Sequence, residues 1–512
     1  MSHPDLSTER AGHSDDDHLR ALGYEPQLDR KINLVANFAL GFLYLSPMVS
    51  VVAIFGLGLT QAGAASIFWI LIVGLGMLLV ALVFGEIVSQ FPIAGGLYQW
   101  TRRLWNGRAA WLMSWIYIGG ITVGITSTAL FSSGFIASLL FGTAEEPSLE
   151  ASPLQTLIIT LCVIGVALLF NLSGGKALAR ISQIGLAGEL IGIIAVGFYL
   201  MVFQRKNDWS VFFDAMGTAG DGSYFGVFLG ASLVGLYMFY GFEACGEVAE
   251  ETPNPARSVP RAMVLTVCVG AVAAVFAFAG YIMAAPNLAQ IVSGEETNPI
   301  PGILQSSLGT FGMKCFLVIV LISFLAGVMG QQTAVSRLVY SFARDDMFPG
   351  SHIIAKTSDS HLPRNALLIT NVLPVLLVIY VYFSPDALFR IAAFQMLAGY
   401  CAFAIVILAA LRARIRGWRP AGQFSLGRWG FLANIGALLY LLAGMVVLGK
   451  PDLSTDALPW YDQWIALLGF SIVAATGIAY LLIAKPHRRS RAPEGDAIEV
   501  ADKLRRGAMA SD

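Results

Sequence analysis

Two glutamates lie inside otherwise apolar stretches of the sequence. Glu243 belongs to YMFYGFEACGE (237–247), and Glu189 belongs to RISQIGLAGELIGIIAVG (180–197). If these stretches cross a membrane, each charge costs at least about 2.5 to 3.5 kcal/mol, so the acids are expected to be functional. Glu243 is a candidate to take up and release a proton, or to brace a weakened helix through hydrogen bonds. For Glu189, proton transfer and a bond to a serine or backbone group are both open.

Other acids lie near the ends of apolar stretches. Glu86, in VFGEIVSQFPIAGG, fits an interfacial anchor or a gate residue. Three acids follow Glu243 toward a polar loop, and we expect them to form structural pairs with Arg257 or Arg261: Glu247, Glu250 and Glu251. Such pairs contribute little when they are exposed.

The remaining reactive side chains do not form a catalytic set. The six histidines lie in polar tails or one polar loop, and the five cysteines are widely and irregularly spaced in apolar segments. These patterns match neither an acid–base pair nor a metal site, and no phosphate-binding loop motif occurs. The sequence therefore predicts no enzyme, no metal and no cofactor, and a net charge of −1 gives no reason to expect a nucleic acid partner.

The elements that position these residues follow from composition. Of 512 residues, 56% are hydrophobic and 13% charged, with a mean hydropathy of +0.69. This predicts an all-α protein that crosses the lipid bilayer many times. Apolar runs of about 20 residues or more give twelve expected spans: 34–58, 62–86, 109–139, 153–173, 181–203, 223–247, 262–285, 312–336, 365–384, 387–411, 429–449 and 461–484.

The basic residues orient these spans. With the N-terminus inside, all but five of the 32 lysines and arginines fall on the cytoplasmic side, as the positive-inside rule requires. The five exceptions are Arg205, Lys206, Lys314, Arg390 and Lys450. We therefore predict a multi-pass protein of the cytoplasmic membrane with cytoplasmic tails at 1–33 and 486–512, and one twelve-span membrane domain at 34–485.

Two spans contain helix-breaking residues. The first, LVANFALGFLYLSPMVSVVAIFGLGL, has Ser46–Pro47 at its middle, and the sixth has Gly241 beside Glu243. Spans separated by five positions are interrupted in this way in transporters built from inverted repeats, where the breaks face a midplane site. The alternatives are a packing kink at Pro47 and a close helix contact at Gly241.

Several segments resemble one transporter family. GFEACGEVAEETPNPARSVPRAM, FGEIVSQFPIAGGLYQWTRRL, SRLVYSFARDDMFP and LGYEPQLDRKINLVANFALGF are similar to segments of the amino acid-polyamine-organocation family, with the last closest to its amino acid/choline transporter branch. The resemblance covers about residues 20–485. It implies twelve transmembrane helices in a leucine-transporter-type fold with discontinuous helices 1 and 6. The two inverted repeats of five spans cover about 34–203 and 223–411, and extra spans follow at 429–484.

The resemblance also implies a substrate site at the two breaks. Its members are Ser46, Pro47, Met48, Val49 and Ser50 from span 1, and Tyr240, Gly241, Phe242 and Glu243 from span 6. Amides at half-helix ends would attract a substrate carboxylate, and freed carbonyls would accept from its ammonium group. Tyr237 matches a position where relatives pack an aromatic side chain on the substrate, although plain packing is the alternative.

One residue departs from the family pattern. Several proton-coupled relatives carry a lysine in span 5 at the position that aligns with Glu189. Glu189 then has a different protonation role, or it helps to hold a cation near span 1 together with Thr333 or Ser336 of span 8. Both hydroxyl groups can instead bond to the backbone. These three residues and Glu243 are the expected ion-coupling or gating residues.

The sequence thus predicts a secondary active permease that works by alternating access. Its expected substrate is an amino acid, a 4-aminobutyrate-like molecule or another small amine, and its expected coupling ion is H+. The alternatives are an exchanger, a sodium-coupled carrier and a membrane receptor that senses the same ligands. The sequence leaves open which solute is carried, its direction and the oligomeric state.

Overall fold

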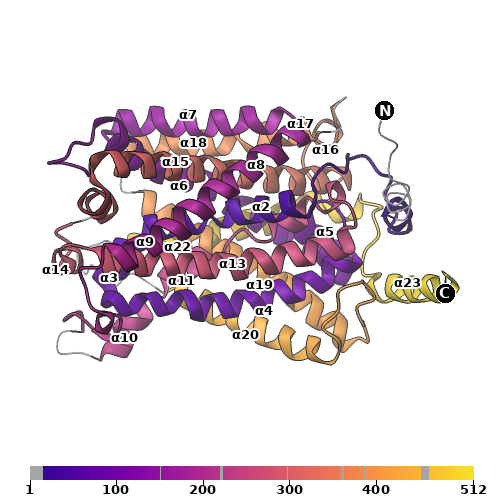
Figure 1. The fold of residues 1–512 in the computed structure, drawn as a ribbon. Helices are drawn as coiled ribbons and strands as arrows, with labels where there is room; N and C mark the ends of the chain where they lie inside the picture. The colour runs from indigo at the N-terminus through magenta and orange to yellow at the C-terminus, as the bar shows by residue number, and fades with distance from the viewer. Residues whose placement is uncertain are drawn as a thin grey trace, which may run out of the picture.

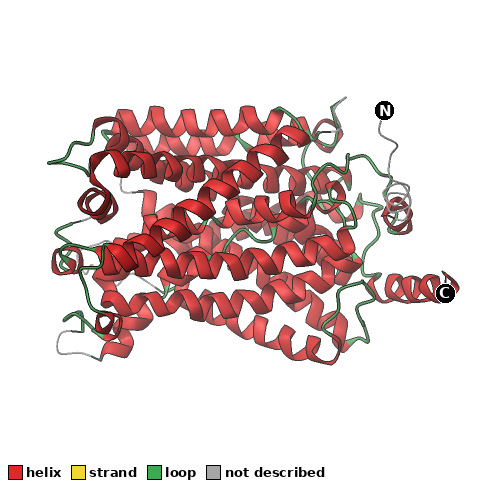
Figure 2. Cartoon of the chain, viewed as in Figure 1, coloured by secondary structure: helices red, strands yellow, loops and turns green. Residues whose placement is uncertain are grey.

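Helices make up most of the chain that the structure describes (Figure 2). The computed structural model describes residues 15–149, 151–219, 223–296, 298–358, 362–384, 387–450 and 460–511. It is 78% helical, and the described ranges contain no strand. In a bilayer each backbone amide and carbonyl must be bonded within the protein, and apolar helices achieve this span by span.

Ten stretches of the described chain are long and apolar enough to cross a membrane: Leu34–Gln90, Gly107–Phe141, Pro153–Leu172, Ser182–Phe203, Pro255–Ala284, Pro299–Arg344, Arg364–Phe383, Phe394–Ile415, Gly427–Leu448 and Ile465–Ala484. The first is 57 residues long, and the apolar helical segment Tyr224–Met238 is shorter than the others. The protein is therefore a multi-pass membrane protein. The count of twelve spans stays a prediction.

The 57-residue stretch contains three α-helices rather than one. Helices α2 (Leu34–Leu45) and α3 (Pro47–Ala62) run in one direction, and α4 (Phe68–Gln90) returns along the bundle (Figure 1). A short 3-10 helix, η1 (Gly63–Ile67), joins them. Gly63 has φ of 63°, a left-handed conformation that favours glycine, so the turn is encoded locally.

The remaining helices, in chain order, are α5 (Gly96–Leu104), α6 (Gly107–Phe141), α7 (Pro153–Leu172), α8 (Gly175–Leu190), the π-helical turn η2 (Ile191–Ala195), α9 (Val196–Phe203), η3 (Trp209–Phe213), α10 (Tyr224–Gly230), α11 (Leu233–Met238), α12 (Ala244–Glu247), η4 (Ala249–Glu251), α13 (Pro255–Ala284), α14 (Leu288–Val292), α15 (Pro299–Arg344), α16 (Ser351–Ile354), α17 (Arg364–Thr370), α18 (Val372–Phe383), α19 (Ala387–Ile415), η5 (Gly427–Trp429), α20 (Gly430–Leu448), α21 (Trp460–Gln463), α22 (Ile465–Ala484), η6 (Pro486–Arg488) and α23 (Ala497–Ser511).

Several expected spans differ from the observed helices. The segment expected at 223–247 is divided into α10, α11 and α12, with an extra interruption at Ala231 and Ser232. The segment expected at 181–203 contains the π-helical turn η2. The label α15 covers two helices that meet at a kink at Gly309, so the helix expected at 312–336 starts just after Gly309 and runs on to Arg344. Apolar length predicts a crossing but does not fix where the backbone bends.

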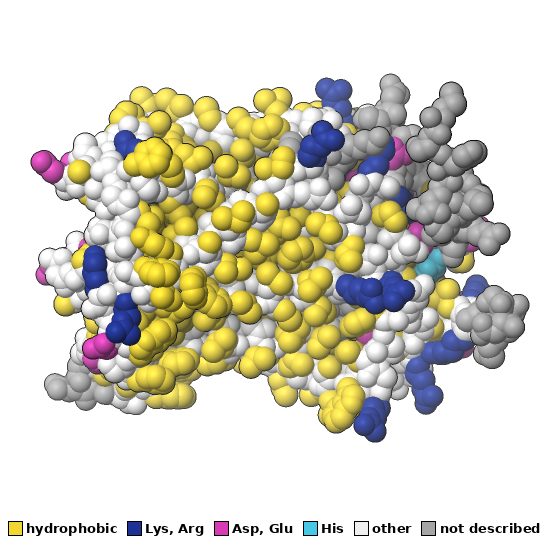
Figure 3. Space-filling view, viewed as in Figure 1, with side chains coloured by type: hydrophobic (Ala, Val, Ile, Leu, Met, Phe, Trp, Pro, Cys, Tyr) yellow, Lys and Arg dark blue, Asp and Glu magenta, His cyan; other side chains and the backbone are white. Residues whose placement is uncertain are grey.

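The surface has a broad apolar band between two polar ends (Figure 3). Exposed leucines of the candidate spans include Leu75 (68% exposed) and Leu169 (67% exposed). Charged side chains gather at the two ends of the view (Figure 3). An apolar patch of this size needs a covering phase, and lipid is the one that fits a chain with ten spanning stretches.

One end of the bundle carries both terminal segments. A short helix over residues 15–21 and helix α23 lie at this end (Figure 1), which we call the tail-bearing end. The segments are packed onto the bundle: Leu22 and Ile32 are buried, and Arg103 of α5 forms an ion pair with Asp496. The expectation that this end is cytoplasmic stays a prediction.

Candidate functional site

The first crossing is interrupted between α2 and α3. Ser46 adopts a left-handed conformation (φ 37°, ψ 83°) between the two helices, and Pro47 starts α3. Proline is favoured at a first helical position because its missing amide would have no partner there. The Ser46 hydroxyl accepts from the Val49 amide at 3.3 Å and so caps α3. The break expected at Ser46–Pro47 is present.

The sixth expected crossing is interrupted between α11 and α12. Helix α11 ends at Met238, and Gly241 has φ of +126°. The Gly241 amide donates to the Glu243 carboxylate at 3.0 Å. The carboxylate therefore binds an amide that the break has released from helical bonding.

The two interruptions touch each other. A Cβ atom built on Gly241 would lie 2.6 Å from the Leu45 amide nitrogen and 2.8 Å from the Tyr44 carbonyl carbon. Both contacts are backbone atoms, which cannot swing aside as a flexible side chain could. Because of this approach and the positive φ, only glycine fits the position without a shift.

Glu189 and Glu243 each accept hydrogen bonds from residues at one of the two breaks. Glu189 Oε1 accepts from the Ser46 hydroxyl at 2.8 Å and from the Met48 amide at 3.2 Å. Glu243 Oε1 accepts from the Tyr117 hydroxyl of α6 at 2.8 Å. Both side chains are fully buried, and neither forms an ion pair with a described basic residue. Their charge therefore has no fixed counterion in this part of the chain.

A small cavity lies between the breaks. It is lined by Tyr44, Leu45, Ser46, Val49, Ser50, Thr128, Tyr237, Tyr240, Gly327, Gln331, Gln395 and Met396. Its free volume is about 20 Å³. One water molecule needs about 10 to 15 Å³ by this measure, so these side chains have to move apart before an organic solute fits.

The cavity collects five of the nine expected substrate-binding residues: Ser46, Val49, Ser50, Tyr237 and Tyr240. The other four lie around it. Gly241 packs on the α2 backbone, and Phe242 packs on Phe403 with ring centroids 5.7 Å apart. Pro47 faces Gly270 of α13, and the Met48 sulfur lies 3.6 Å from the Ser323 hydroxyl of α15.

The two hydroxyl residues expected near Glu189 bond elsewhere. Thr333 donates to the Asn171 side chain at 2.7 Å, and Ser336 donates to the Thr333 carbonyl at 2.8 Å. Ser323, which touches Met48, lies ten residues earlier on the same helix, or about 15 Å along its axis. Thr333 and Ser336 are thus nearer to the tail-bearing end, and Glu189 takes its hydroxyl bond from Ser46.

The opposite wall of the cavity carries polar residues that were not among the expected site residues. Thr128 comes from α6, Gln331 from α15 and Gln395 from α19. One end of the Gln331 side-chain amide bonds to the Thr128 hydroxyl at 2.9 Å, and its other end has no partner among described residues. Ser127 donates to Gln395 at 2.9 Å. A glutamine inside a long apolar helix is a signal that could have identified these positions.

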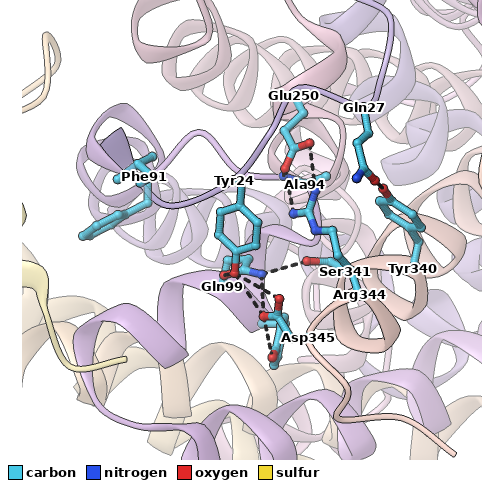
Figure 4. A network of polar contacts seen from close by, with 12 residues as sticks. Tyr24, Gln27, Phe91, Ala94, Gln99, Glu250, Tyr340, Ser341, Arg344 and Asp345 are labelled. Atoms are coloured by element: carbon cyan, nitrogen blue, oxygen red, sulfur yellow. Dashed lines mark hydrogen bonds and ion pairs between the residues drawn. The ribbon is translucent and has the colours of Figure 1, made fainter. Parts of the chain in front are cut away.

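Carboxylates at the tail-bearing end are bonded differently. Glu250 pairs with Arg344 at 2.9 Å (Figure 4), and Glu251 pairs with Arg337 at 2.8 Å. The prediction that Glu250 and Glu251 pair with Arg257 or Arg261 was wrong, because α15 places two arginines from about ninety residues away beside these acids. Glu247 accepts from the Leu97 amide at 3.4 Å and forms no ion pair with a described residue.

Glu86, expected to be an anchor or gate residue, is fully buried at the same end. It pairs with Arg414 of α19 and accepts from the Leu426 amide at 2.6 Å. The ion pair joins the end of α4 to α19, and the Leu426 bond joins it to the segment between α19 and α20. Glu86 therefore ties distant parts of the chain together at the tail-bearing end.

The segment before α2 extends this polar network. The Tyr24 hydroxyl lies 3.1 Å from Gln99 and from both carboxylate oxygens of Asp345 (Figure 4). The Arg344 guanidinium stacks over the Tyr24 ring, 4.3 Å from its centroid. The Tyr340 hydroxyl donates to Gln27 at 2.7 Å. Residues 22–33, which we call the leader, are therefore joined to α5 and α15 across this end of the bundle.

Comparison with known proteins agrees with this architecture. The family described as "Amino acid permease" matches residues 36–480. The chain belongs to this family. Similarity to the amino acid-polyamine-organocation family, expected from the motifs, is thereby confirmed.

Relatives of this permease come from plants and fungi. The amino-acid permease BAT1 of Arabidopsis thaliana is 24% identical over 461 residues, covering 85% of this chain and 88% of that protein. The polyamine transporter TPO5 of Saccharomyces cerevisiae is 24% identical over 486 residues, covering 91% of this chain and 78% of that protein. Both names describe transporters, which agrees with the expectation that this permease is not an enzyme.

Proposed function

We propose that the protein is a secondary active transporter that carries an amino acid or a related small amine across the cytoplasmic membrane by alternating access. The observation that carries this proposal is the cavity between the two interrupted crossings, where polar groups from α3, α6, α15 and α19 converge. Irregular backbone at membrane depth is tolerated where protein or a water-filled cavity covers it. The names of the relatives support the same solute classes.

The proposed cycle opens the two ends of the bundle in turn. At the tail-bearing end, ion pairs and the Tyr24–Asp345 network join the leader, α5, η4 and α15. The cavity itself is too small for a solute. Release toward this end therefore requires these contacts to separate, and entry from the other end requires them to hold.

The proposed coupling ion is a proton, with Glu243 as the group that carries it. Glu243 binds the Gly241 amide and the Tyr117 hydroxyl, so a change in its protonation alters the bonding of the break itself. Loss of the negative charge weakens the carboxylate's hold on both donors. Proton binding and the shape of the cavity are then linked through one side chain.

Uptake into proteoliposomes tests the proposal. Purified protein should accumulate labelled amino acids or amines when an inward proton gradient is imposed, and a protonophore should abolish accumulation. The panel should include neutral, acidic and basic amino acids, 4-aminobutyrate and di- and polyamines. Accumulation that needs sodium but no proton gradient would contradict proton coupling, and absence of uptake across the whole panel would contradict transport.

A further inference from the structure

The N-terminus of α3 is occupied by side chains of the protein itself. Pro47 has no amide proton, the Met48 amide donates to Glu189, and the Val49 amide donates to Ser46. Helix α3 is 16 residues long, so its N-terminus has a substantial positive dipole and is a natural place for an anion. Glu189 supplies that anion from within the chain.

The second break offers a weaker place for a carboxylate. The amides of Tyr240 and Phe242 make no hydrogen bond to described residues. They adjoin the Glu243 carboxylate, which already binds the Gly241 amide. The helix that follows, α12, is four residues long and adds little dipole. A second carboxylate here would face a buried acid without a described counterion.

The same breaks leave acceptors open. Pro47 cannot donate to the Leu43 carbonyl, and the Met48 amide bonds to Glu189 rather than to the Tyr44 carbonyl. Neither carbonyl accepts a hydrogen bond from a described residue. The second carboxylate oxygen of Glu189 is buried and also has no described partner. These groups suit a ligand that is rich in hydrogen-bond donors.

The cavity wall favours positive charge. No described lysine, arginine or histidine lines it, whereas three tyrosines do: Tyr44, Tyr237 and Tyr240. Aromatic faces attract an ammonium group, most strongly where water is excluded. A cation near Glu189 would also supply the counterion that the described structure does not provide, and buried charges are normally paired.

We propose that this transporter selects cationic amines that lack an α-carboxylate, because Glu189 holds the position on α3 that the carboxylate of an amino acid would need. This assignment rests on the proposed transport function and narrows it. The ammonium group binds the carbonyls of the first break near Glu189. An amino acid would have to displace Glu189 from Ser46 and Met48 or place two carboxylates together.

Matched pairs that differ only in the α-carboxylate test the assignment. The full-length protein is assayed for binding and proteoliposome uptake with putrescine and ornithine, cadaverine and lysine, and tyramine and tyrosine. We expect the amine of each pair that binds to do so at least about tenfold more tightly than its parent amino acid. Equal or tighter binding of the amino acids, with transport intact, overturns this assignment alone. Uptake of neither member of any pair contradicts the transport function as well.

Two variants locate the effect at Glu189. Glu189→Gln keeps an oxygen acceptor for Ser46 and Met48 but removes the charge, so the preference for the amine should fall. Glu189→Ala releases the Met48 amide, so amino acid binding should rise relative to amine binding. Glu499→Gln, at an exposed position of α23, is the matched control and should keep the wild-type preference. An unchanged preference in Glu189→Gln would contradict the role of this carboxylate, and the wild-type pairs remain decisive if a variant does not fold.

Discussion

Buried carboxylates have different bonding partners in two regions of this permease. At the tail-bearing end Glu250, Glu251 and Glu86 each pair with an arginine. Around the cavity Glu189 and Glu243 bind hydroxyl and amide donors, and no described basic side chain pairs with them. All five are nearly or fully inaccessible to solvent, so burial alone does not distinguish the regions. What differs is whether the neutralising charge belongs to the protein.

This difference distinguishes contacts that hold the tail-bearing end closed from contacts that can bind a proton or a ligand. An internal ion pair has satisfied its charge and holds two segments together until motion separates them. An acid without an internal cation can exchange a proton or accept a cationic ligand at modest cost to the fold. The comparison therefore predicts that substitutions in the first region act mainly on stability and those in the second mainly on transport.

The largest effect is expected from removing one partner of the Arg337–Glu251 pair. Arg337→Met leaves Glu251 without its cation in a site where 5% of its side chain is exposed. Breaking a buried pair in this way costs about 3 to 5 kcal/mol. Thermal unfolding of the detergent-purified protein should show a correspondingly large decrease in stability.

A double substitution sharpens this result. Arg337→Met with Glu251→Leu removes both charges, and most of the lost stability should return because a well-packed apolar pair replaces the ion pair at little cost. Arg20→Met, in an exposed pair with Asp17, is the control and should change stability by less than about 0.5 kcal/mol. If the double variant is as unstable as the single one, arginine packing rather than charge pairing holds this end.

The next effect concerns the unpaired acid Glu243. Glu243 has no ion-pair partner among described residues, so Glu243→Gln leaves no buried cation unpaired. The glutamine keeps an oxygen for Tyr117 or Gly241, and stability should therefore change little. Gradient-driven uptake should nevertheless fall at least about tenfold, equivalent to 1.36 kcal/mol in the limiting step. Uptake under a proton gradient and substrate exchange at equal pH are measured side by side. Equal loss in both assays would indicate a defect in binding or folding instead of coupling.

A smaller effect is expected from the leader. Tyr24→Phe removes the hydroxyl that contacts Gln99 and Asp345. One such hydrogen bond contributes about 1 kcal/mol, or up to about 3 when its partner is charged. Hydrogen exchange of residues 22–32 should become faster, while Tyr461→Phe, half-exposed in α21, should leave it unchanged. Protection equal to that of the wild type would show that apolar contacts alone hold the leader.

The smallest effect concerns His18, which lies outside the spanning segments. Its ring nitrogen lies 3.2 Å from the Gln90 carbonyl, and burial lowers the pKa of His18 although Gln90 and Asp15 act in the opposite direction. The docked segment thus favours neutral histidine, whereas the detached one gains a proton below about pH 6.5. Docking should weaken as the pH falls from 7 to 5. His18→Gln should flatten this dependence in hydrogen exchange of residues 15–21, and an unchanged profile would assign it to another group.

Local chemistry made part of the site predictable. Proline at position 47 fixes φ and lacks an amide donor, and glycine at position 241 weakens a helix and tolerates positive φ, so both breaks could be inferred from the chain itself. An acid between apolar residues is equally visible, which identified Glu243 and Glu189. These inferences needed no knowledge of how the helices pack.

Contacts between distant segments were not predictable in this way. Glu251 pairs with Arg337, 86 residues away, whereas the sequence favoured arginines a few residues downstream. Thr333 was expected near Glu189, but the position of the first crossing along α15 decides which hydroxyl is within reach. The opposite wall, with Gln331 and Gln395, likewise depends on helix rotation. Helix packing fixes these choices: a glutamine in an apolar helix is visible in the sequence, but the neighbours that it faces are not.

The leader's docking has a consequence for the assembly of the protein. Tyr24 is synthesised 321 residues before its partner Asp345. The Ile32 amide donates to the Glu251 carbonyl at 3.0 Å, and this acceptor is also synthesised much later. The start of the chain therefore reaches its final place only after α15 has been inserted. If synthesis stalls before α15 is made, the leader has no docking site and stays exposed to membrane proteases.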